Sequence, residues 1–366
     1  MKRVVVGMSG GVDSSVTALL LKKQGYDVIG VNLNVWQKKK EDCSSEKACC
    51  GIDAIYDARR VCQNLDIPFY TLNFKDIFKR DVIDYFANEY MEGKTPNPCI
   101  ACNRYVKFEE LLNQALTVFE ADYIATGHYA KVGHDEETGR YYIYESVTAA
   151  KDQTYALYNL TQDQLKHILM PLGDYTKEDV RKIARENGLE NANKHDSQEI
   201  CFVEDNDYAK FIEENYNYKS IPGNFIDTDG SILGKHKGII HYTVGQRRGL
   251  GLSLKEPLYV VKLDIPNNNV VLGRSDMLFS DTLICTNLNF MPFEKLLEPL
   301  NCTAKVRYSA KKAECTIYHL ENGDVKVIFN KPQRAVTPGQ AVVFYDGNIV
   351  IGGGTIIWVR KQMGKK

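Results

Sequence analysis

Residues 4–21, VVVGMSGGVDSSVTALLL, carry the clearest signal in this chain of 366 residues. A run of apolar residues with β-type character leads into a turn with two adjacent glycines, and a helical pattern opens directly after it. Gly10 and Gly11 have no Cβ, so the backbone there can approach an anion closely. The serine hydroxyls of the turn and the free N–H groups at the beginning of the helix would be directed toward the same anion. The stretch therefore predicts a strand–loop–helix unit that binds a phosphate group.

The loop lacks the Gly-Lys-Ser/Thr ending of a Walker A motif, whose lysine reaches the β- and γ-phosphates of a nucleotide. The absence of this lysine fits a site that binds the pyrophosphate part of ATP while an acceptor attacks the α-phosphorus. The string SGGVDS at residues 9–14 resembles the PP-loop of ATP pyrophosphatases, which adenylate a carbonyl oxygen and release pyrophosphate. The alternative is a tight glycine turn between strand and helix, and the full string in this context favours the PP-loop.

The composition is that of an ordinary globular protein, with 44% hydrophobic and 25% charged residues, and the length allows two or three domains. No apolar run approaches the roughly 20 residues of a membrane span, and residues 2–6 do not resemble a signal peptide. We therefore expect a cytoplasmic protein without a membrane partner. Ten cysteines in such a chain indicate a reducing compartment, in which thiols serve as metal ligands or catalysts.

Charge is distributed unevenly along the chain. Residues 301–366 hold eleven Lys and Arg against four Asp and Glu, a net charge of +7, which leaves −8 on the rest. A basic terminal module beside an acidic body is typical of a protein with a polyanionic partner. A solvated basic face without a partner remains the alternative on charge alone.

Strands alternate with helices over the first part of the chain, which predicts a parallel sheet with helices on both faces. Strands are expected at residues 4–8, 28–33, 69–74 and 122–127, and helices at residues up to 24 and at 53–65, 76–91, 107–119, 161–172 and 176–188. In the last helix Thr176 is the expected N-cap, Asp179 lies in the first turn and Gly188 is the expected C-cap. Ligands of such sheets lie beyond the carboxyl ends of the strands. The turn at residues 9–15 and the string TGHY at 126–129 both follow strands, so we expect one nucleotide pocket made from both.

From about residue 221 glycine rises and short alternating strands appear. We expect them at residues 258–263, 270–272, 302–308, 314–319, 325–329, 341–345 and 349–352. The predicted organisation is an α/β catalytic domain at residues 1–200, a small β-rich linking domain at 201–278 and a C-terminal β-barrel at 279–366. Residues 38–51, with their charges and three cysteines, are expected to form a mobile loop.

The string TPNPCIACN at residues 95–103 is the second informative stretch. Two prolines within three residues argue against a regular helix or central strand, which predicts that Cys99 and Cys102 are presented on a loop. A Cys-x-x-Cys pair alone is ambiguous between zinc, an iron–sulfur cluster and redox chemistry. Cys201 is a third candidate. The cysteines that could complete a metal site are Cys43, Cys49, Cys50 and Cys62, whereas Cys285, Cys302 and Cys315 lie in strand-like sequence and are expected in the core.

Taken together, these strings resemble the tRNA-specific 2-thiouridylases, the MnmA/TrmU family, which replace O2 of the wobble uridine of tRNA by sulfur. The resemblance covers essentially the whole chain and rests on GMSGGVDS at 7–14, TPNP at 95–98 with CN at 102–103, ATGHY at 125–129, KDQ at 151–153, DS at 196–197 with ICF at 200–202, HYT at 241–243 with GQR at 245–247 and GL at 249–250, RY at 307–308 and TPGQ at 337–340. Several such strings in the right order are far more specific than any one of them.

The resemblance implies a fold of the adenine nucleotide α-hydrolase type and roles for individual residues. The ATP site would be lined by Gly7, Met8, Ser9, Gly10, Gly11, Val12, Asp13, Ser14, Leu33 and Gly127. Cys102 matches the nucleophile of the family and Cys201 its persulfide carrier, and the two would form a transient disulfide. The target base would lie against Asn97, Pro98 and Cys99. The tRNA would be contacted by His128, Lys151, Asp152, Gln153, Arg307, Tyr308 and Gln340.

The chemistry of such a reaction explains these residue types. Uracil O2 is a poor leaving group, so adenylation by ATP comes first, and a persulfide is a strong sulfur nucleophile at neutral pH. Its sulfur would displace AMP at C2 directly, or after Cys102 attacks Cys201 and frees sulfide. Mg²⁺ is expected with the triphosphate, and Asp13 is the nearest carboxylate. The family also implies a sulfur-donor protein, a cysteine desulfurase or a relay carrier. Some members carry Asp where this chain has Cys99, so an acid/base role there is unfilled or falls to a thiolate or water.

Two alternatives remain open at this point. One is another PP-loop enzyme, such as an argininosuccinate synthetase, which needs no paired reactive cysteines. The other is an RNA-binding protein that holds an iron–sulfur cluster on Cys99, Cys102 and Cys201. The colour and iron content of anaerobically purified protein would distinguish the second.

Overall fold

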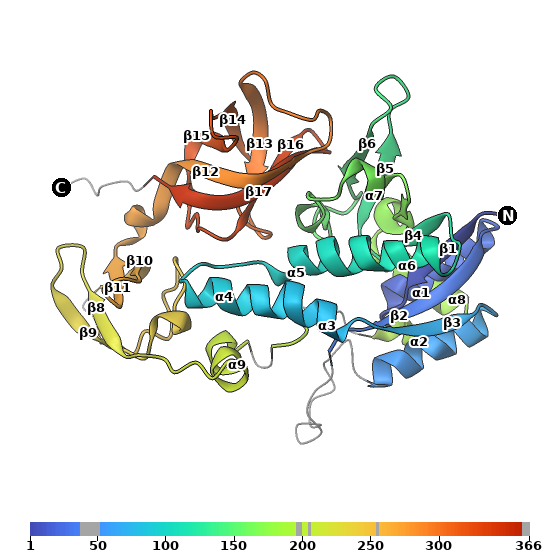
Figure 1. The fold of residues 1–366 in the computed structure, drawn as a ribbon, viewed down its shortest axis with the longest axis horizontal. Coiled ribbons are helices and arrows are strands. Elements are labelled where there is room, and N and C mark those ends of the chain that lie inside the picture. The colour runs from blue at the N-terminus through green and yellow to red at the C-terminus, as the bar shows by residue number, and fades with distance from the viewer. Residues whose placement is uncertain (37–51, 195–199, 204–205, 254–255, 361–366) are drawn as a thin grey trace. The chain divides into compact units, whose positions relative to one another are not determined.

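The computed structural model describes residues 1–36, 52–194, 200–203, 206–253 and 256–360 (Figure 1). This part of the chain divides into two compact units, which are described separately below. The first comprises Met1–Ile83, Pro98–Phe202 and Asn348–Ile351, and the second Asp84–Asn97, Val203–Gly347 and the chain from Gly352 onward. The predicted loop at residues 38–51, with Cys43, Cys49 and Cys50, lies outside the described residues. The predicted three-domain division at residues 200 and 278 stays a prediction.

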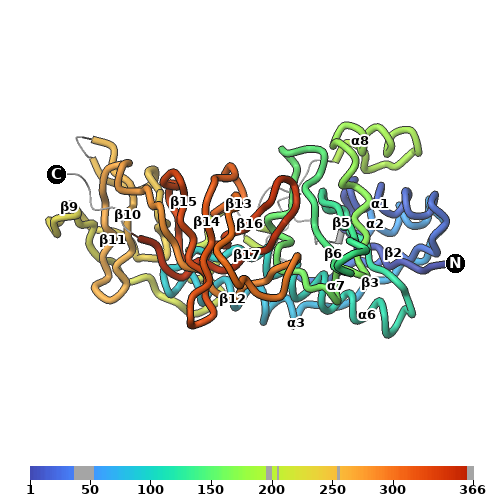
Figure 2. The backbone as a smooth tube through the Cα atoms, turned by 90° about the horizontal axis from the view of Figure 1, so that it is seen from above, coloured from blue at the N-terminus to red at the C-terminus, as the bar shows by residue number. Residues whose placement is uncertain are grey.

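A five-stranded parallel sheet forms the centre of the first unit, with the order β3-β2-β1-β4-β7. Its strands are β1 (Arg3–Gly7), β2 (Asp27–Asn34), β3 (Phe69–Asn73), β4 (Tyr123–Ala125) and β7 (Ile168–Leu169). Val4, Val5 and Val6 of the central strand are completely buried. Side chains alternate along a strand, so this run needs cover on both faces, and Figure 2 shows helices on either side of the sheet. The predicted α/β class is confirmed.

The helices of the first unit follow the predicted pattern in most places. They are α1 (Val12–Lys23), α2 (Ile52–Asn64), α3 (Lys75–Phe78), α5 (Pro98–Ala101), α6 (Leu111–Thr117), α7 (Gln162–Leu165) and α8 (Lys177–Glu186), with π-helical segments at Lys79–Asp84 and Cys102–Glu110. In α8 the Thr176 side chain accepts from the backbone N–H of Asp179 and the Asp179 carboxylate accepts in return, which confirms the predicted N-terminus. Asn187 is the C-cap, and Gly188 follows it with φ +66°.

Two local predictions were wrong. The segment at residues 161–172 is not one helix, because α7 is short and Ile168 and Leu169 instead pair with β4 as an added parallel strand. The segment around the two prolines is not a loop, because Pro98 is the first residue of α5 and Cys102 begins the π-helical segment. Proline is well tolerated at the first helical position, where its missing N–H has no partner in any case.

One hairpin of the first unit has no counterpart in the prediction. Strands β5 (Ala130–His134) and β6 (Tyr141–Glu145) pair antiparallel, and Ile349 of the segment 348–351 pairs with Tyr144. Its residues Tyr141–Tyr142–Ile143–Tyr144 carry aromatic side chains on both faces, so the alternation of polar and apolar residues that marks a strand is weak there.

The second unit contains two helices and a small sheet. The helices are α4 (Tyr85–Met91) and α9 (Tyr208–Asn215), and the sheet has the order β10-β11-β8-β9. The strands are β8 (Gly223–Ile226), β9 (Ile232–His236), β10 (Tyr259–Asp264) and β11 (Asn269–Gly273). Phe225, Val260, Val270 and Leu272 form the buried centre of its core. The predicted β-rich texture of this region is therefore confirmed.

The remaining strands form a closed six-stranded barrel in the order β12-β15-β14-β13-β16-β17, and β12 pairs with β17 to close it. They are β12 (Phe279–Phe290), β13 (Leu300–Lys305), β14 (Ala313–His319), β15 (Val325–Arg334), β16 (Ala341–Asp346) and β17 (Ile349–Val359). The predicted C-terminal β-barrel is confirmed. The strand predicted at residues 302–308 ends at Lys305, so Arg307 and Tyr308 lie in the turn of the β13–β14 hairpin rather than on a strand.

Within the described ranges, no helix combines the length and the apolar character that crossing a membrane requires.

Candidate active site

The loop between β1 and α1 is held in a single conformation by its own side chains. Ser14 Oγ donates to the carbonyl of Gly11 at 3.1 Å and accepts from the backbone N–H of Ser9 at 3.2 Å. Gly10 has φ +74°, and a Cβ there would collide with the carbonyl oxygen of Ala54 in α2. Glycine is therefore required at this position by its backbone conformation and by the helix behind it, in addition to any bound anion.

The start of α1 is arranged as an anion site. Gly11 is the N-cap and supplies no side-chain acceptor for the first-turn N–H groups. Orphan N–H groups together with the helix dipole favour a negative charge at this end. Asn32 of β2 donates from Nδ2 to the carbonyl of Met8 at 2.8 Å, which ties the neighbouring strand to the loop. The residues present therefore fit the phosphate chain of a nucleotide.

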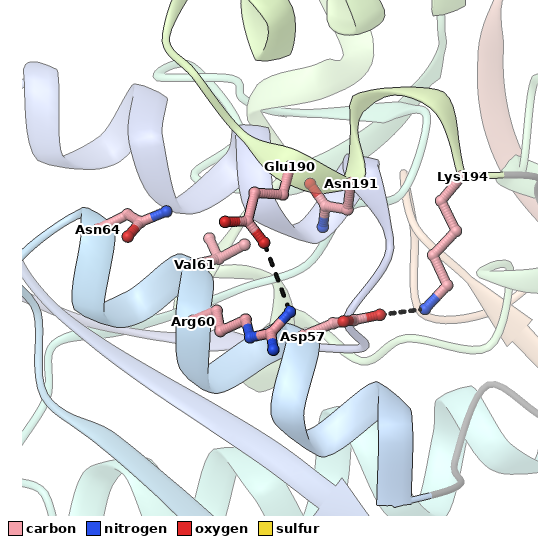
Figure 3. A pocket seen from close by; sticks show the side chains of 7 residues that line it. All are labelled: Asp57, Arg60, Val61, Asn64, Glu190, Asn191 and Lys194. Atoms are coloured by element: carbon pink, nitrogen blue, oxygen red, sulfur yellow. Dashed lines mark hydrogen bonds and ion pairs between the residues drawn. The ribbon is translucent and has the colours of Figure 1, made fainter.

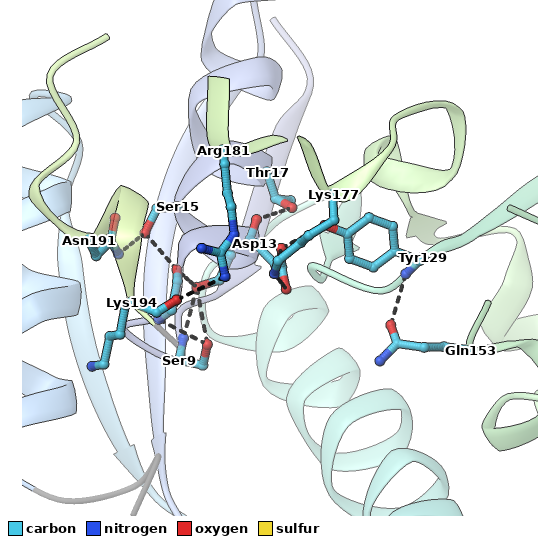
Figure 4. Close-up of polar contacts among 12 residues, drawn as sticks. Ser9, Asp13, Ser15, Thr17, Tyr129, Gln153, Lys177, Arg181, Asn191 and Lys194 are labelled. Carbon is cyan, nitrogen blue, oxygen red and sulfur yellow. Dashed lines mark hydrogen bonds and ion pairs between the residues drawn. The ribbon is translucent and has the colours of Figure 1, made fainter. Parts of the chain in front are cut away.

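Asp13, in the first turn of α1, is fixed by two side chains from other elements (Figure 4). Lys177 Nζ lies 2.8 Å from Oδ1 and 2.9 Å from Oδ2 of this carboxylate, and Tyr129 donates its hydroxyl to Oδ1 at 2.8 Å. The Lys177 side chain is 9% exposed and that of Asp13 is 29% exposed. The ammonium group thus sits at the edge of the predicted phosphate site, at the N-terminus of α8.

Gly127 meets the same turn from β4. A Cβ at Gly127 would lie 2.9 Å from backbone atoms of Asp13 and Ser14, so the strand end and the start of α1 are in close contact. Leu33, at the end of β2, remains partly exposed. The structure therefore brings the ends of β1, β2 and β4 to one edge of the sheet, as predicted. Their contact with ATP stays a prediction.

A pocket of about 350 Å³ lies next to the loop, between α2 and the turn Glu190–Asn193 (Figure 3). Two ion pairs line it, Asp57 with Lys194 at 2.7 Å and Arg60 with Glu190 at 3.6 Å. Asn191 Nδ2 donates to Ser15 Oγ at 2.8 Å and so connects this pocket to α1. None of the three candidate cysteines lines the pocket, and its cations are already paired, so we assign the chemistry elsewhere.

The cysteines Cys99, Cys102 and Cys201 all belong to the first unit. Burial raises the pKa of the Cys102 thiol to about 12, and the charges of Cys201 and Cys99 act in the same direction. Cys99 is exposed as a residue. Burial of its sulfur atom nevertheless raises the pKa of the thiol, and the charge of Cys201 raises it further. Cys201 itself is exposed. The three sulfur atoms are therefore within electrostatic reach of one another, although the chain separates Cys201 from the other two by about a hundred residues.

Lys107 is a cation whose charge acts on this cysteine cluster. It lowers the pKa of Cys99 and of Cys102, opposing the effect of burial. Its Nζ donates to Asn103 Oδ1 at 3.0 Å, and Asn103 Nδ2 donates to the carbonyl of Ala156 at 2.9 Å, which fixes the ammonium group in place. A positive charge beside a thiol favours the thiolate, which is the reactive form.

His128 is buried on the same side of the unit. Its Nδ1 shares a hydrogen bond of 2.7 Å with the hydroxyl of Thr126, and its ring lies 5.7 Å from that of Phe108. Burial lowers the pKa of His128 well below its usual value, and the charge of Lys107 adds to this effect. The imidazole is therefore neutral at physiological pH, and its predicted contact with tRNA stays a prediction.

The other residues predicted to contact tRNA have defined places. Asp152 is buried and accepts from the Thr154 hydroxyl at 2.6 Å, and Gln153 Oε1 accepts from the backbone N–H of Tyr129 at 2.9 Å. In the second unit, Gln340 Nε2 donates to the carbonyl of Thr95 at 2.8 Å. These three side chains support the local backbone in the structure. Lys151 is half-buried.

Arg307 and Tyr308 lie in the β13–β14 turn. Tyr308 is 47% exposed, and Arg307 Nε is buried without a hydrogen-bond partner among the described residues. Asn97 belongs to the second unit, whereas Pro98 and Cys99 belong to the first. Cys62 is completely buried in α2, where burial raises its pKa to about 12, so it is a core residue rather than a ligand. Cys285 and Cys315 are likewise buried, as predicted, whereas Cys302, which was also expected in the core, is only half-buried.

Comparison with known proteins decides which family has this arrangement. Three family models match consecutive segments: the tRNA methyl transferase HUP domain at residues 2–205, the tRNA methyl transferase PRC-barrel domain at residues 209–274 and the aminomethyltransferase beta-barrel domain at residues 280–356. A tRNA-specific 2-thiouridylase MnmA from Acetivibrio thermocellus is 60% identical over 97% of this chain and 99% of its own length. The chain belongs to the MnmA family.

Other MnmA relatives are nearly as similar. The chain is 58% identical to a tRNA-specific 2-thiouridylase MnmA of Lachnoclostridium phytofermentans, over 98% of this chain and all of the relative. Among solved structures, a 4-thiouridine synthetase in complex with RNA and ATP covers 55% of this chain and 45% of its own, at 15% identity and a TM-score of 0.33. That likeness is too weak to carry an argument, and the assignment to the MnmA family rests on the sequence relatives.

Two residues of this candidate site were not predicted from the sequence. Lys177 directly follows the N-cap of α8, where a positive charge is disfavoured by the helix dipole. A lysine at this unfavourable position indicates a functional role and could have been noticed in the sequence. Lys107 gave no such signal. It lies five residues after Cys102, a spacing that separates two side chains on an α-helix, but the widened π-helical turn returns the fifth position to the same face.

Proposed function

We propose that this chain is an ATP-dependent sulfurtransferase that converts the wobble uridine of tRNA into 2-thiouridine. The observation that carries the proposal is the combination, in one unit of an MnmA family member, of an uncapped phosphate-binding loop with three cysteines in mutual electrostatic reach. Another PP-loop ligase would need the loop but not the cysteines. The proposed location is the cytoplasm, and the proposed partners are tRNA and a protein that donates sulfur, a cysteine desulfurase or a relay carrier.

The first step activates the base. ATP would lie against residues 7–14, Leu33 and Gly127, with its phosphates at the N-terminus of α1. Uridine O2 attacks the α-phosphorus, the bond to the β-phosphate breaks, and pyrophosphate leaves. Mg²⁺, when bound with the nucleotide, would neutralise phosphate charge, and Asp13 is the carboxylate nearest to hold it. Lys177 orients that carboxylate and adds a fixed positive charge beside the leaving pyrophosphate.

The second step transfers sulfur. A persulfide on Cys201 attacks C2 with its terminal sulfur, and AMP leaves from the activated oxygen. Cys102 then attacks the Sγ atom of Cys201. The bond between this Sγ atom and the sulfur now attached to C2 breaks, which releases the thiolated uridine and leaves a Cys102–Cys201 disulfide. A thiol reductant restores both cysteines. The exposure of Cys201 suits a residue that must receive sulfur from another protein, and the partial burial of Cys102 suits one that acts after the substrate is in place.

Asn97, Pro98 and Cys99 would pack against the target base, and Cys99 has no carboxylate to act as an acid or base. We propose that Cys99 is a contact residue. Among the described residues no group of three or more His, Cys, Asp or Glu side chains is arranged to hold a metal ion, so the geometry does not favour the iron–sulfur alternative, and no step is derived through a cluster.

The proposed tRNA surface includes the turn of the β13–β14 hairpin. Arg307 is only partly buried, and a guanidinium group is suited to a phosphate or a base edge. Tyr308 beside it is exposed and offers a ring for stacking. Both lie in a turn that also carries Lys311, within the basic segment 301–366. His128, Lys151, Asp152, Gln153 and Gln340 are proposed contacts of the same ligand.

Nucleoside analysis of tRNA tests this function most simply. In cells that lack the protein, 2-thiouridine derivatives should disappear from the wobble position, and a plasmid copy should restore them. Copies carrying Cys102→Ser or Cys201→Ser should not restore them. Retention of the modification in the deletion strain, or restoration by the cysteine variants, would contradict the proposal.

A further inference from the structure

The barrel contains a second pair of neighbouring cysteines that the proposed reaction does not use. Cys302 of β13 and Cys315 of β14 are directly opposite each other in an antiparallel pair, and their Sγ atoms lie 3.6 Å apart. Residues opposite each other in such a pair have Cα atoms about 4.5 or 5.5 Å apart, and both values fall within the range that a disulfide spans. The two strands therefore already hold the cysteines at a distance at which rotation of the side chains can join them.

The surroundings make the two thiols unequal. Cys302 is partly exposed, whereas Cys315 is only 3% exposed. The hydrogen bond with Cys302, followed by burial, raises the pKa of Cys315, so that thiol stays protonated. Cys285, the other cysteine of the barrel core, is directed elsewhere, because its thiol donates to the carbonyl of Val325. An oxidant would therefore meet Cys302 first.

We propose that Cys302 and Cys315 form a thiol-oxidation site, in which a peroxide converts the pair into a cross-strand disulfide. The Cys302 thiolate attacks one oxygen of hydrogen peroxide, the O–O bond breaks, hydroxide leaves, and Cys302 becomes a sulfenic acid. The Cys315 sulfur then attacks the Cys302 sulfur, the S–O bond breaks, and water leaves with the thiol proton. One peroxide is reduced and two thiols are oxidised. A dithiol reductant reverses the reaction.

The position of the pair gives the disulfide a consequence. Cys302 and Cys315 lie in the stem of the β13–β14 hairpin, and the pair Ala304–Ala313 is the next on the same face toward its turn. The turn carries Arg307 and Tyr308. A disulfide in the stem limits the opening of the hairpin and so the freedom of the turn. The consequence for tRNA binding rests on the proposed function, whereas formation of the disulfide does not.

Peptide mapping of the full-length protein tests the site directly. The reduced protein would be treated with one equivalent of hydrogen peroxide, its remaining thiols alkylated, and the sample digested with trypsin without reduction. Lys305, Arg307, Lys311 and Lys312 lie between the two cysteines, so the disulfide joins two separate peptides. We expect this linked pair, lighter than the two reduced peptides by two hydrogens, and we expect it to vanish after treatment with dithiothreitol. It should form equally in a Cys102→Ser, Cys201→Ser background, which removes the proposed catalytic pair.

Two variants separate the steps. Cys302→Ser should abolish the linked peptide, and Cys315→Ser should leave a sulfenic acid on Cys302 that dimedone captures. The proposal is overturned if both cysteines of the wild-type protein remain alkylatable after peroxide, or if Cys302 is joined to a different cysteine. tRNA affinity of the oxidised and reduced protein should differ in the Cys102→Ser, Cys201→Ser background. Equal affinities alongside a linked peptide would overturn the effect on tRNA and leave the oxidation site standing.

Discussion

Lys177 Nζ contacts both carboxylate oxygens of Asp13, at 2.8 and 2.9 Å, and so joins the first turn of α8 to the first turn of α1. Two helix N-termini, each with a partial positive charge, meet at this ion pair. The carboxylate offsets that charge, and the lysine stays beside the proposed phosphate site. We therefore propose that Lys177 is part of the nucleotide site, although no phosphate-binding motif contains it.

Replacing Lys177 by Met should therefore impair adenylation. The variant leaves the Asp13 carboxylate partly buried without its cation, and removal of one charge aimed at the leaving group lowers a rate by roughly 100-fold. We expect a loss of that size in AMP formation with tRNA and ATP. Lys182→Met is the matched control, because Lys182 lies on the same helix with its side chain 69% exposed and should leave the rate unchanged. Equal rates for the two variants would remove Lys177 from the site.

Gly127 tests the contact between β4 and the phosphate loop. In Gly127→Ala the new Cβ would lie 2.9 Å from backbone atoms of Asp13 and Ser14, so the start of α1 must move. We expect ATP affinity, measured by calorimetry, to fall at least about tenfold, an energy of roughly 1.4 kcal/mol. Gly139→Ala, between β5 and β6, is the control for a strained glycine replacement without a steric clash, since Gly139 has φ +67° but its Cβ would meet nothing within 4 Å. Unchanged ATP affinity in Gly127→Ala would place the nucleotide elsewhere.

The charge of Lys107 should control the reactivity of Cys102. Because burial raises the pKa of this thiol to about 12, its thiolate fraction at pH 8 is small and rises tenfold with each pH unit. Alkylation of Cys102 by iodoacetamide, followed by mass spectrometry, should therefore accelerate from pH 7 to pH 10. In Lys107→Met the loss of positive charge raises the pKa further, so alkylation at pH 8 should be slower.

Arg104→Met provides the comparison for Lys107, because Arg104 is an exposed cation of the same π-helical segment. Its removal should leave the alkylation rate of Cys102 unchanged, and Lys107→Arg should preserve most of it. A rate in Lys107→Met that equals the rate in the wild type would show that the ammonium group does not act on the thiol.

Arg307 should contribute to tRNA binding through a phosphate or base edge. If Arg307 contacts a phosphate, binding of the Arg307→Gln variant to tRNA releases one counterion fewer. The slope of log affinity against log salt concentration then becomes shallower by about 0.9 in a duplex region. Lys295→Gln, which removes an exposed cation from a neighbouring segment of the same unit, should change the slope little. Equal slopes for Arg307→Gln and the wild type, measured by filter binding over a range of salt, would argue against a phosphate contact.

The sequence-based prediction was most successful where one short stretch determines its own structure. The loop at residues 9–15 and the start of α8 were predictable because glycine conformation, serine hydroxyls and a Thr–Asp capping box act within a few residues. The closed barrel was predictable in kind, since short strands with turn signals suggest it. Its strand ends were not, and Arg307 lies in a turn rather than on a strand for that reason.

The geometry of the cysteine site could not be predicted from short stretches of sequence. Pro98 suggested a loop, yet as a first helical residue it starts α5 and places Cys102 at the head of a π-helical segment. In that widened turn the fifth position returns to the same face, which places Lys107 near Cys102. The approach of Cys201 is set by the fold of the whole unit, and no spacing in the sequence encodes it. The resemblance to a known family named these cysteines, but it did not supply the cation that acts on them.

The most direct test of the account is a reconstituted reaction that follows two products at once. Purified protein would be mixed with unmodified tRNA transcript, ATP, Mg²⁺ and a persulfide-loaded cysteine desulfurase, and both AMP and 2-thiouridine would be measured by mass spectrometry. We predict both products with the wild type, and AMP without 2-thiouridine for Cys201→Ser and Cys102→Ser, because activation of O2 uses no thiol. Formation of 2-thiouridine without ATP, or by either cysteine variant, would contradict the account.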